Sequence, residues 1–110
     1  MIRLMVALIA IAFAPAVSHA GGNAESGKAK AAQVCAACHG PDGNKPSAPD
    51  QPVLAGQYED YLVKALSDYK NDKRKNPIMK SFASQLSKKD MEDLAAWFSS
   101  QKTTSLHDQR

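Results

Sequence analysis

Two cysteines and a histidine stand close together in the stretch Cys35-Ala36-Ala37-Cys38-His39, which has the form C-x-x-C-H. On a helix, positions i, i+3 and i+4 lie on one face, so both thiols and the imidazole are predicted to point the same way. Two such thiols can form thioethers with the two vinyl groups of one porphyrin, and the adjacent imidazole can bind its iron. The pattern therefore predicts covalent attachment of one c-type haem, with His39 as the proximal ligand.

Other uses of these three residues fit the sequence less well. A thioredoxin-like redox site needs only two thiols and leaves His39 without a role. A tetrahedral zinc site needs a second pair of ligands, and the chain has only 2 cysteines. The remaining alternatives are an ordinary disulfide and an exported thiol protein that carries no haem.

The first twenty residues have the pattern of a secretory signal peptide. Arg3 provides a positive charge, residues 4–14 form an apolar run, and Ser18 and Ala20 are small residues before a cleavage site. An earlier small-x-small site is an alternative, but a proline lies within it. The apolar run is far shorter than the ~20 residues of a membrane-spanning helix. We therefore expect residues 1–20 to be removed, a location in the periplasm, and no membrane span in the mature chain.

Removal of this segment from the 110-residue chain leaves about 90 residues, which we interpret as one small domain at 21–102 and a polar tail at 103–110. A domain of this size buries a modest hydrophobic core and often needs a further stabilising feature, such as a cross-link or a cofactor. A covalent haem would provide one. Without Arg3 the chain has 13 basic and 11 acidic residues, a net charge of about +2. This near balance disfavours binding to nucleic acid, which normally requires a strongly basic surface.

The hydrophobic pattern predicts an all-α domain. The first helix is expected to begin at Asn23 as its N-cap and to run through the cysteines to Gly40. Residues 40–56 are rich in proline and glycine and form a loop, one of whose carbonyls would hold the Nδ1 proton of His39. Further helical segments are indicated by an amphipathic stripe over 58–69, a proline start at Pro77, and a capping box at Ser87 and Asp90.

Several side chains outside the motif have predicted roles. Gly27 and Ala31 lie four residues apart on one helix face, which favours a close crossing by another helix. Tyr61 is a candidate to donate its hydroxyl to a haem propionate, with Tyr58 as the alternative. The basic segment 70–75 is either a docking patch for an acidic redox partner or a solvated turn.

The second axial ligand of a haem iron must come from a sulfur or imidazole group after residue 20. The candidates are His107, Met91 and Met79. His107 lies in the polar tail, and Met91 lies on the inward face of the last predicted helix. Met79 follows Pro77, where a loop passes into a short helix, so we predict Met79 as the ligand. A histidine–methionine pair raises the potential of haem iron and leaves no open position for oxygen or peroxide.

Four motifs follow one another along the chain: the haem-attachment pattern with the residues after it at 35–44, and then 54–57, 76–79 and 86–98. With these motifs the chain resembles a class I c-type cytochrome and is similar to one half of the two-haem periplasmic cytochromes. The resemblance implies three main helices plus a short helical segment around one covalent haem, with the first and last helices crossing nearly at right angles. It also implies Met79 as the methionine ligand and the Pro49 carbonyl as the support of His39, with Pro46 and Pro52 as alternatives.

The resemblance implies a single-electron carrier that is not an enzyme and that cycles haem iron between its ferrous and ferric states. The expected partners are redox proteins of the periplasm, with a terminal oxidase or a dehydrogenase among the candidates, and the expected state is a monomer. One alternative is an electron-transfer subunit of a larger dehydrogenase or oxidase. Another is an enzyme or gas sensor whose haem has an open site.

Overall fold

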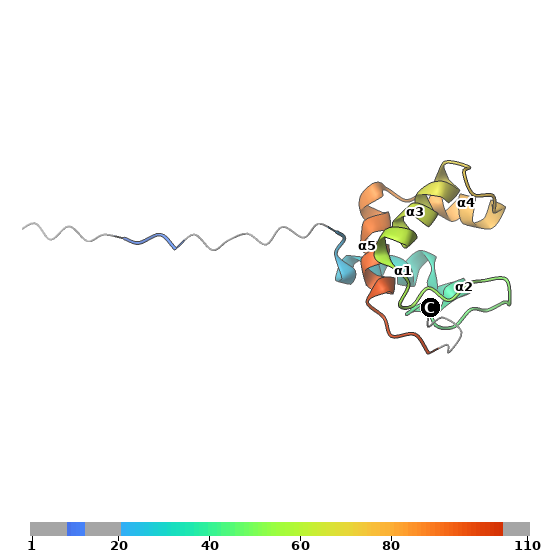
Figure 1. Cartoon of the computed structure of the whole chain (residues 1–110), viewed down its shortest axis with the longest axis horizontal. Coiled ribbons are helices and arrows are strands. Elements are labelled where there is room, and N and C mark those ends of the chain that lie inside the picture. Colours follow the sequence, from blue (N-terminus) through green and yellow to red (C-terminus); the bar gives the residue numbers. More distant parts are fainter. Residues whose placement is uncertain (1–8, 13–20, 105–110) are drawn as a thin grey trace, which may run out of the picture.

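The computed structural model describes residues 9–12 and 21–104, and within this part of the chain it contains helices and no β-strand. The helices are α1 (Ala24–Val34), α2 (Ala36–His39), α3 (Glu59–Lys70), α4 (Pro77–Ala83) and α5 (Lys88–Ser99) (Figure 1). The all-α prediction is confirmed. The predicted signal peptide, apart from residues 9–12, and His107 lie outside the described residues. In the described ranges no helix is long and apolar enough to cross a membrane.

Polar side chains cap the starts of three helices, and the sequence predicted two of these caps, at Asn23 and Ser87. The Asn23 side chain accepts a hydrogen bond from the backbone in the first turn of α1. Asn76 does the same for α4, which has Pro77 in its first turn. At the start of α5, the Ser87 and Asp90 side chains each accept a bond from the other residue's backbone N–H. Each cap satisfies N–H groups that have no partner within the helix.

The first predicted helix is interrupted at Cys35, so the expectation of one helix continuing to Gly40 is wrong. The backbone of Cys35 has φ −111° and ψ −33°, which ends α1 and begins the single turn of α2. The N–H groups of Cys38 and His39 both donate to the Cys35 carbonyl, at 3.2 and 3.0 Å. The i, i+3, i+4 relation of the motif is therefore kept within one turn, although the longer helix is broken.

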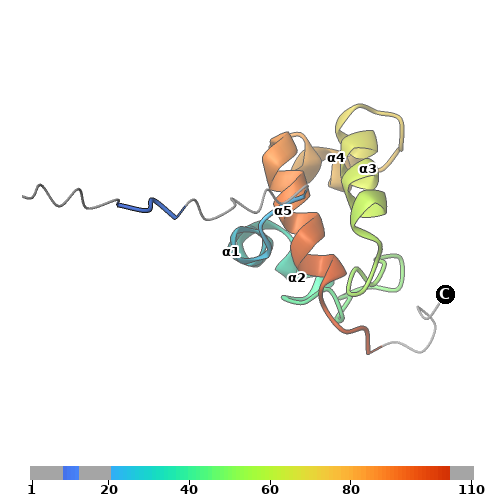
Figure 2. The same ribbon diagram turned by 60° about the vertical axis from the view of Figure 1, so that its left-hand side comes forward.

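Helices α1 and α5 cross where α1 has its smallest side chains. Figure 2 shows α1 nearly end-on while α5 passes across it, in agreement with the steep crossing that the family resemblance implies. A Cβ atom built on Gly27 would lie 1.9 Å from the backbone oxygen of Asp93. Ala31, one turn later, is fully buried at 0 % exposure. The predicted close approach at these two positions is confirmed.

Replacing Gly27 with alanine will destabilise the haem-loaded protein, although alanine is the better helix former by roughly 1 kcal/mol. The added methyl group overlaps the backbone of α5, and overpacking of this kind typically costs about 1–3 kcal/mol. Chemical unfolding measures the change in free energy. Ser26→Ala, at an exposed position of the same helix, is the matched control and is expected to be near neutral. A Gly27→Ala protein as stable as wild type would contradict the close crossing.

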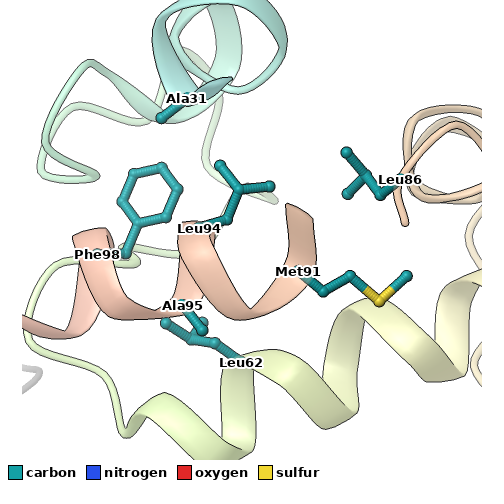
Figure 3. Close-up of a cluster of buried hydrophobic side chains, with 7 residues drawn as sticks. All are labelled: Ala31, Leu62, Leu86, Met91, Leu94, Ala95 and Phe98. Atoms are coloured by element: carbon teal, nitrogen blue, oxygen red, sulfur yellow. The ribbon is translucent and has the colours of Figure 1, made fainter. Parts of the chain in front are cut away.

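The hydrophobic core lies between α5 and its neighbours. In Figure 3, Leu94 and Phe98 point from α5 toward Ala31 of α1, while Ala95 lies against Leu62 of α3. Met91 belongs to the same buried cluster, with 4 % of its surface exposed. The core thus holds α1 and α3 on two sides of α5.

A buried carboxylate strengthens the junction of α1 and α5. Asp93 accepts hydrogen bonds from the backbone N–H of Asn23, at 2.7 Å, and from the Lys89 ammonium, at 2.6 Å. Burial alone would raise the pKa of Asp93, but these two donors outweigh it and hold the pKa below its usual value. The ionised carboxylate therefore links the cap of α1 to the middle of α5.

Candidate functional site

A cavity of about 360 Å³ lies beside the C-x-x-C-H motif. Pockets for small molecules and cofactors span roughly 300–1,000 Å³ and are lined mostly by apolar side chains. The walls come from the α1–α2 junction, the loop after α2, and helices α3, α4 and α5. Most of the lining is apolar and includes Val34, Leu54, Leu62, Leu66, Ile78, Phe82, Leu94 and Phe98.

Both cysteines of the motif line this cavity, and both are free thiols. Burial, together with the neighbouring Cys38, raises the pKa of Cys35 to about 11. Cys35 is therefore a neutral thiol at neutral pH. Redox-active C-x-x-C motifs instead contain a thiolate whose pKa is lowered by its surroundings. The environment of Cys35 thus favours an attachment site over a thiol–disulfide redox site.

His39 lines the same cavity, and a hydrogen bond to the loop fixes the orientation of its ring. Only 7 % of the residue is exposed, and Nδ1 lies 2.9 Å from the carbonyl oxygen of Pro52. A carbonyl can only accept a hydrogen bond, so Nδ1 must carry the proton. The lone pair of the neutral ring is then on Nε2. Metal-binding histidines commonly have their second nitrogen held in this way, which sets both tautomer and orientation.

The preference for Pro49 as the support of His39 is wrong, because the carbonyl comes from Pro52. The loop makes a tight turn over 47–51, in which the backbone N–H of Gln51 donates to Ala48. The Gln51 side-chain oxygen accepts from Ser47 and Ala48 and closes the turn from within. This turn leaves Pro49 exposed at its outer end, and the chain returns to His39 only at Pro52.

The loop that supports His39 is tied to the C-terminal end of the described chain through Asn44. Its Nδ2 donates to the carbonyl of Lys102 at 2.8 Å, and its Oδ1 accepts from the backbone N–H of Thr104 at 2.8 Å. The same side chain donates to Asp42 within the loop, at 3.0 Å. One side chain therefore holds Lys102 and Thr104 against the loop.

Replacing Asn44 with alanine will loosen the loop at 40–56 and the segment at 101–104 together. Removing one partner of a hydrogen bond costs about 1–3 kcal/mol when the other partner is left without a replacement. Hydrogen exchange of the haem-loaded protein is expected to become faster in both segments. Asn71→Ala is the control, since its side chain donates a local hydrogen bond to Ser67, one turn earlier on α3. Faster exchange in only one of the two segments would contradict the link.

Helix α4 and the start of α3 bring two further predicted residues to the cavity. Met79 of α4 and Tyr61 of α3 both line it, together with the cysteines and His39. Met91 does not line the cavity and belongs to the core, as expected. Tyr58, the alternative to Tyr61, is 70 % exposed and does not line the cavity. Tyr58 is the N-cap of α3, so the amphipathic stripe predicted over 58–69 faces the cavity only from Tyr61 onward.

The basic segment 70–75 is not a uniformly solvated patch. The Lys70 ammonium donates to the carbonyl of Leu86, and Arg74 lines the cavity. Sequence reasoning missed a site role for Arg74 because it stands in a run of surface cations. A usable signal was present in Tyr61 and Tyr69, which lie eight residues apart on one face of α3 and both contact Arg74.

The donor groups and the cavity fit a covalently attached haem. Two thiols, an imidazole with Nε2 available, and a thioether sulfur share a cavity whose walls are largely apolar. Apolar walls suit the porphyrin faces, and histidine with methionine is a known axial pair in c-type cytochromes. An all-α domain built around this motif and this cavity defines the class I c-type cytochromes.

Comparison with known proteins agrees with this class: the chain belongs to the cytochrome c family, whose model matches residues 24–102. It is 48 % identical over 100 residues to cytochrome c4 of Pseudomonas aeruginosa, covering 91 % of this chain and 49 % of that protein. It is 39 % identical to cytochrome c-554(548) of Halomonas halodenitrificans, covering 74 % of this chain and 99 % of that protein.

A solved structure shows the same arrangement of helices. The crystal structure of reduced recombinant cytochrome c4 from Pseudomonas stutzeri superimposes with a TM-score of 0.69 at 48 % identity. The match covers 76 % of this chain and 47 % of that one. The chain therefore spans about half the length of the cytochrome c4 relatives, and almost the whole length of the cytochrome from Halomonas halodenitrificans.

Proposed function

We propose that this chain is a periplasmic single-electron carrier with one covalent haem c. In this proposal Cys35 and Cys38 form the thioethers, His39 and Met79 are the axial ligands, and Tyr61 lies at a propionate. When bound, the haem supplies one-electron exchange between ferrous and ferric iron. The protein is then no catalyst, and it passes electrons between redox proteins.

The observation that carries the proposal is the position of His39 between the Pro52 carbonyl and the cavity. The bond from Nδ1 to Pro52 keeps the ring in one orientation and one tautomer, which makes Nε2 the metal-binding atom. Met79 reaches the same cavity from α4, whose start is fixed by the Asn76 cap. Ligands held in place by the protein need little rearrangement when the charge on a bound metal changes.

The remaining features of the chain support export and a single cofactor. The apolar run after Arg3 and the small residues Ser18 and Ala20 support a signal peptide at 1–20, which directs the domain at 21–102 to the periplasm. Only 2 cysteines are present, so they supply one haem. The cytochrome c4 relatives are about twice as long as this chain.

The test is a visible spectrum of the exported protein, produced with a haem-attachment system. We expect a c-type α-band in the reduced form that survives denaturation and acid–acetone extraction, and a reversible one-electron titration. Carbon monoxide should not bind the native reduced protein, because both axial positions are filled. A haem-free product with Cys35 and Cys38 as thiols or a disulfide would overturn the proposal. Tight binding of carbon monoxide would instead indicate an open-site enzyme or sensor.

A further inference from the structure

Helix α4, which carries Met79, has little hydrophobic attachment to the rest of the domain. Of its 7 residues, all of which the structure describes, Ala83 alone is buried, while Ile78 and Phe82 are 65 % and 39 % exposed. Among the helices it lies against α3 (Figure 1). A helix this short is not stable by itself in water. Polar contacts must therefore help to hold α4 in place.

Lys80, the residue after Met79, ties α4 to the end of α3. Its ammonium donates to the carbonyl of Lys70, the last residue of α3, at 2.9 Å, and to a carboxylate oxygen of Asp72, also at 2.9 Å. Carbonyls in the last turn of a helix have no partner within the helix, and the helix dipole favours a cation there. One ammonium thus joins the middle of α4 to two acceptors at the end of α3.

The turn after α3 brings the Asp72 carboxylate to this ammonium. Asp72 adopts the left-handed conformation with φ +61°, which aspartate tolerates better than most residues. The backbone N–H groups of Lys73 and Arg74 then both donate to the carbonyl of Asp68, at 2.9 and 3.1 Å. The chain therefore turns sharply after α3, and Asp72 lies within reach of Lys80 on α4.

A second polar contact crosses the same junction in the opposite direction. The Lys70 ammonium donates to the carbonyl of Leu86, a core residue that follows α4 and is only 4 % exposed. Lys70 is therefore the acceptor for Lys80 through its carbonyl and the donor to Leu86 through its side chain. The chain is tied to the end of α3 both within α4 and just after it.

We propose that Lys80 is a positioning residue for Met79, because its bonds to Lys70 and Asp72 limit how often α4 moves away from the cavity and Met79 leaves the haem iron. This inference rests on the function proposed above and deepens it. Met79 lines the cavity and Lys80 does not, so the effect of the lysine on the haem is indirect. An exposed ion pair alone contributes little, but this ammonium also satisfies a helix carbonyl.

The test measures how fast cyanide binds to the oxidised, haem-loaded protein. Cyanide can bind only after Met79 has left the iron, so the rate at low cyanide concentration reports how often α4 opens. Lys80→Gln removes the ammonium, and we expect its rate to rise about three- to tenfold, as for loss of a partly exposed charged hydrogen bond. Asp72→Asn keeps a residue that tolerates the left-handed conformation and removes only the carboxylate charge, so a smaller rise is expected.

Lys64→Gln is the matched control. It removes the same charge and also breaks an ion pair, with Asp68, but this pair lies within α3. Its cyanide rate should match that of wild type. Hydrogen exchange should become faster in α4 of Lys80→Gln and stay unchanged in α1 and α5. In a Met79→Ala background the ligand position is already open, so Lys80→Gln should have no further effect on the rate.

Equal cyanide rates in Lys80→Gln and Lys64→Gln would overturn the inference, because a purely structural lysine lowers the unfolding free energy without changing this difference. A further rise in the Met79→Ala background would also overturn it, since the lysine would then act on the entry of cyanide. If Lys80→Gln accumulates without haem, Asp72→Asn decides, and a wild-type rate there overturns the inference. Wild-type protein that lacks haem, or that binds cyanide as fast as Met79→Ala, would refute the proposed function instead.

Discussion

Replacing both cysteines, as Cys35→Ala with Cys38→Ala, is expected to abolish covalent haem and most of the stability of the fold. The cavity beside them measures about 360 Å³. Empty core volume costs about 24 cal/mol per Å³, so a dry void of this size would cost on the order of 9 kcal/mol. That cost is comparable to the whole stability of a small domain, about 5–15 kcal/mol. A chain that lost its haem could not keep the cavity open and would lose helical structure with it.

Intact mass measured after denaturation reports attachment, and far-ultraviolet circular dichroism reports helix content. Each single replacement should keep one thioether and so retain covalent haem in part. Ala37→Ser changes an exposed residue between the two cysteines and is expected to match wild type in both measurements. Covalent haem in the double variant would show that the attachment site lies elsewhere. A haem-free chain with undiminished helix content and unfolding midpoint would refute the structural role of the haem.

The parts of the fold that the sequence predicted correctly depend on short-range patterns. Caps act within one turn of a helix, which is why the starts at Asn23 and Ser87 could be located, and Pro77 located the start of α4 in the same local way. The close crossing at Gly27 was predictable because a glycine inside a helix is unfavourable without a packing reason. The cysteine motif is equally local, since its three functional residues share one turn.

The parts that could not be predicted depend on contacts between residues far apart in the chain. The choice of Pro52 over Pro49 follows from a turn closed by the Gln51 side chain, and no spacing rule specifies that turn. The bonds from Asn44 join it to residues 58 and 60 positions later. In the sequence, Arg74 cannot be distinguished from the other cations of the segment 70–75. In the structure, the turn after α3 brings its side chain to Tyr61. In each case the position of a side chain depends on how a loop or turn folds, which the sequence pattern does not specify.

Replacing Met79 with alanine will leave covalent haem in place but change its electronic properties. Methionine opposite histidine raises the potential of haem iron, so loss of the sulfur lowers it. Axial ligands set haem potentials over roughly 0.8 V, and we expect a fall that is a substantial fraction of this range. The weak far-red sulfur-to-iron band of the oxidised protein should disappear. Because the vacated position would be open, carbon monoxide and cyanide should then bind.

Met91→Leu is the control, because it removes the other methionine after residue 20 without touching the cavity. Met91 is buried in the core with 4 % exposed, and a volume-conserving exchange there typically costs less than about 1.5 kcal/mol. Its potential and far-red band should match those of wild type. Retention of the band in Met79→Ala, or its loss in Met91→Leu, would refute Met79 as the ligand. Since Met79 is held by α4 and Met91 by α5, the pair of variants also identifies which helix supplies the second ligand.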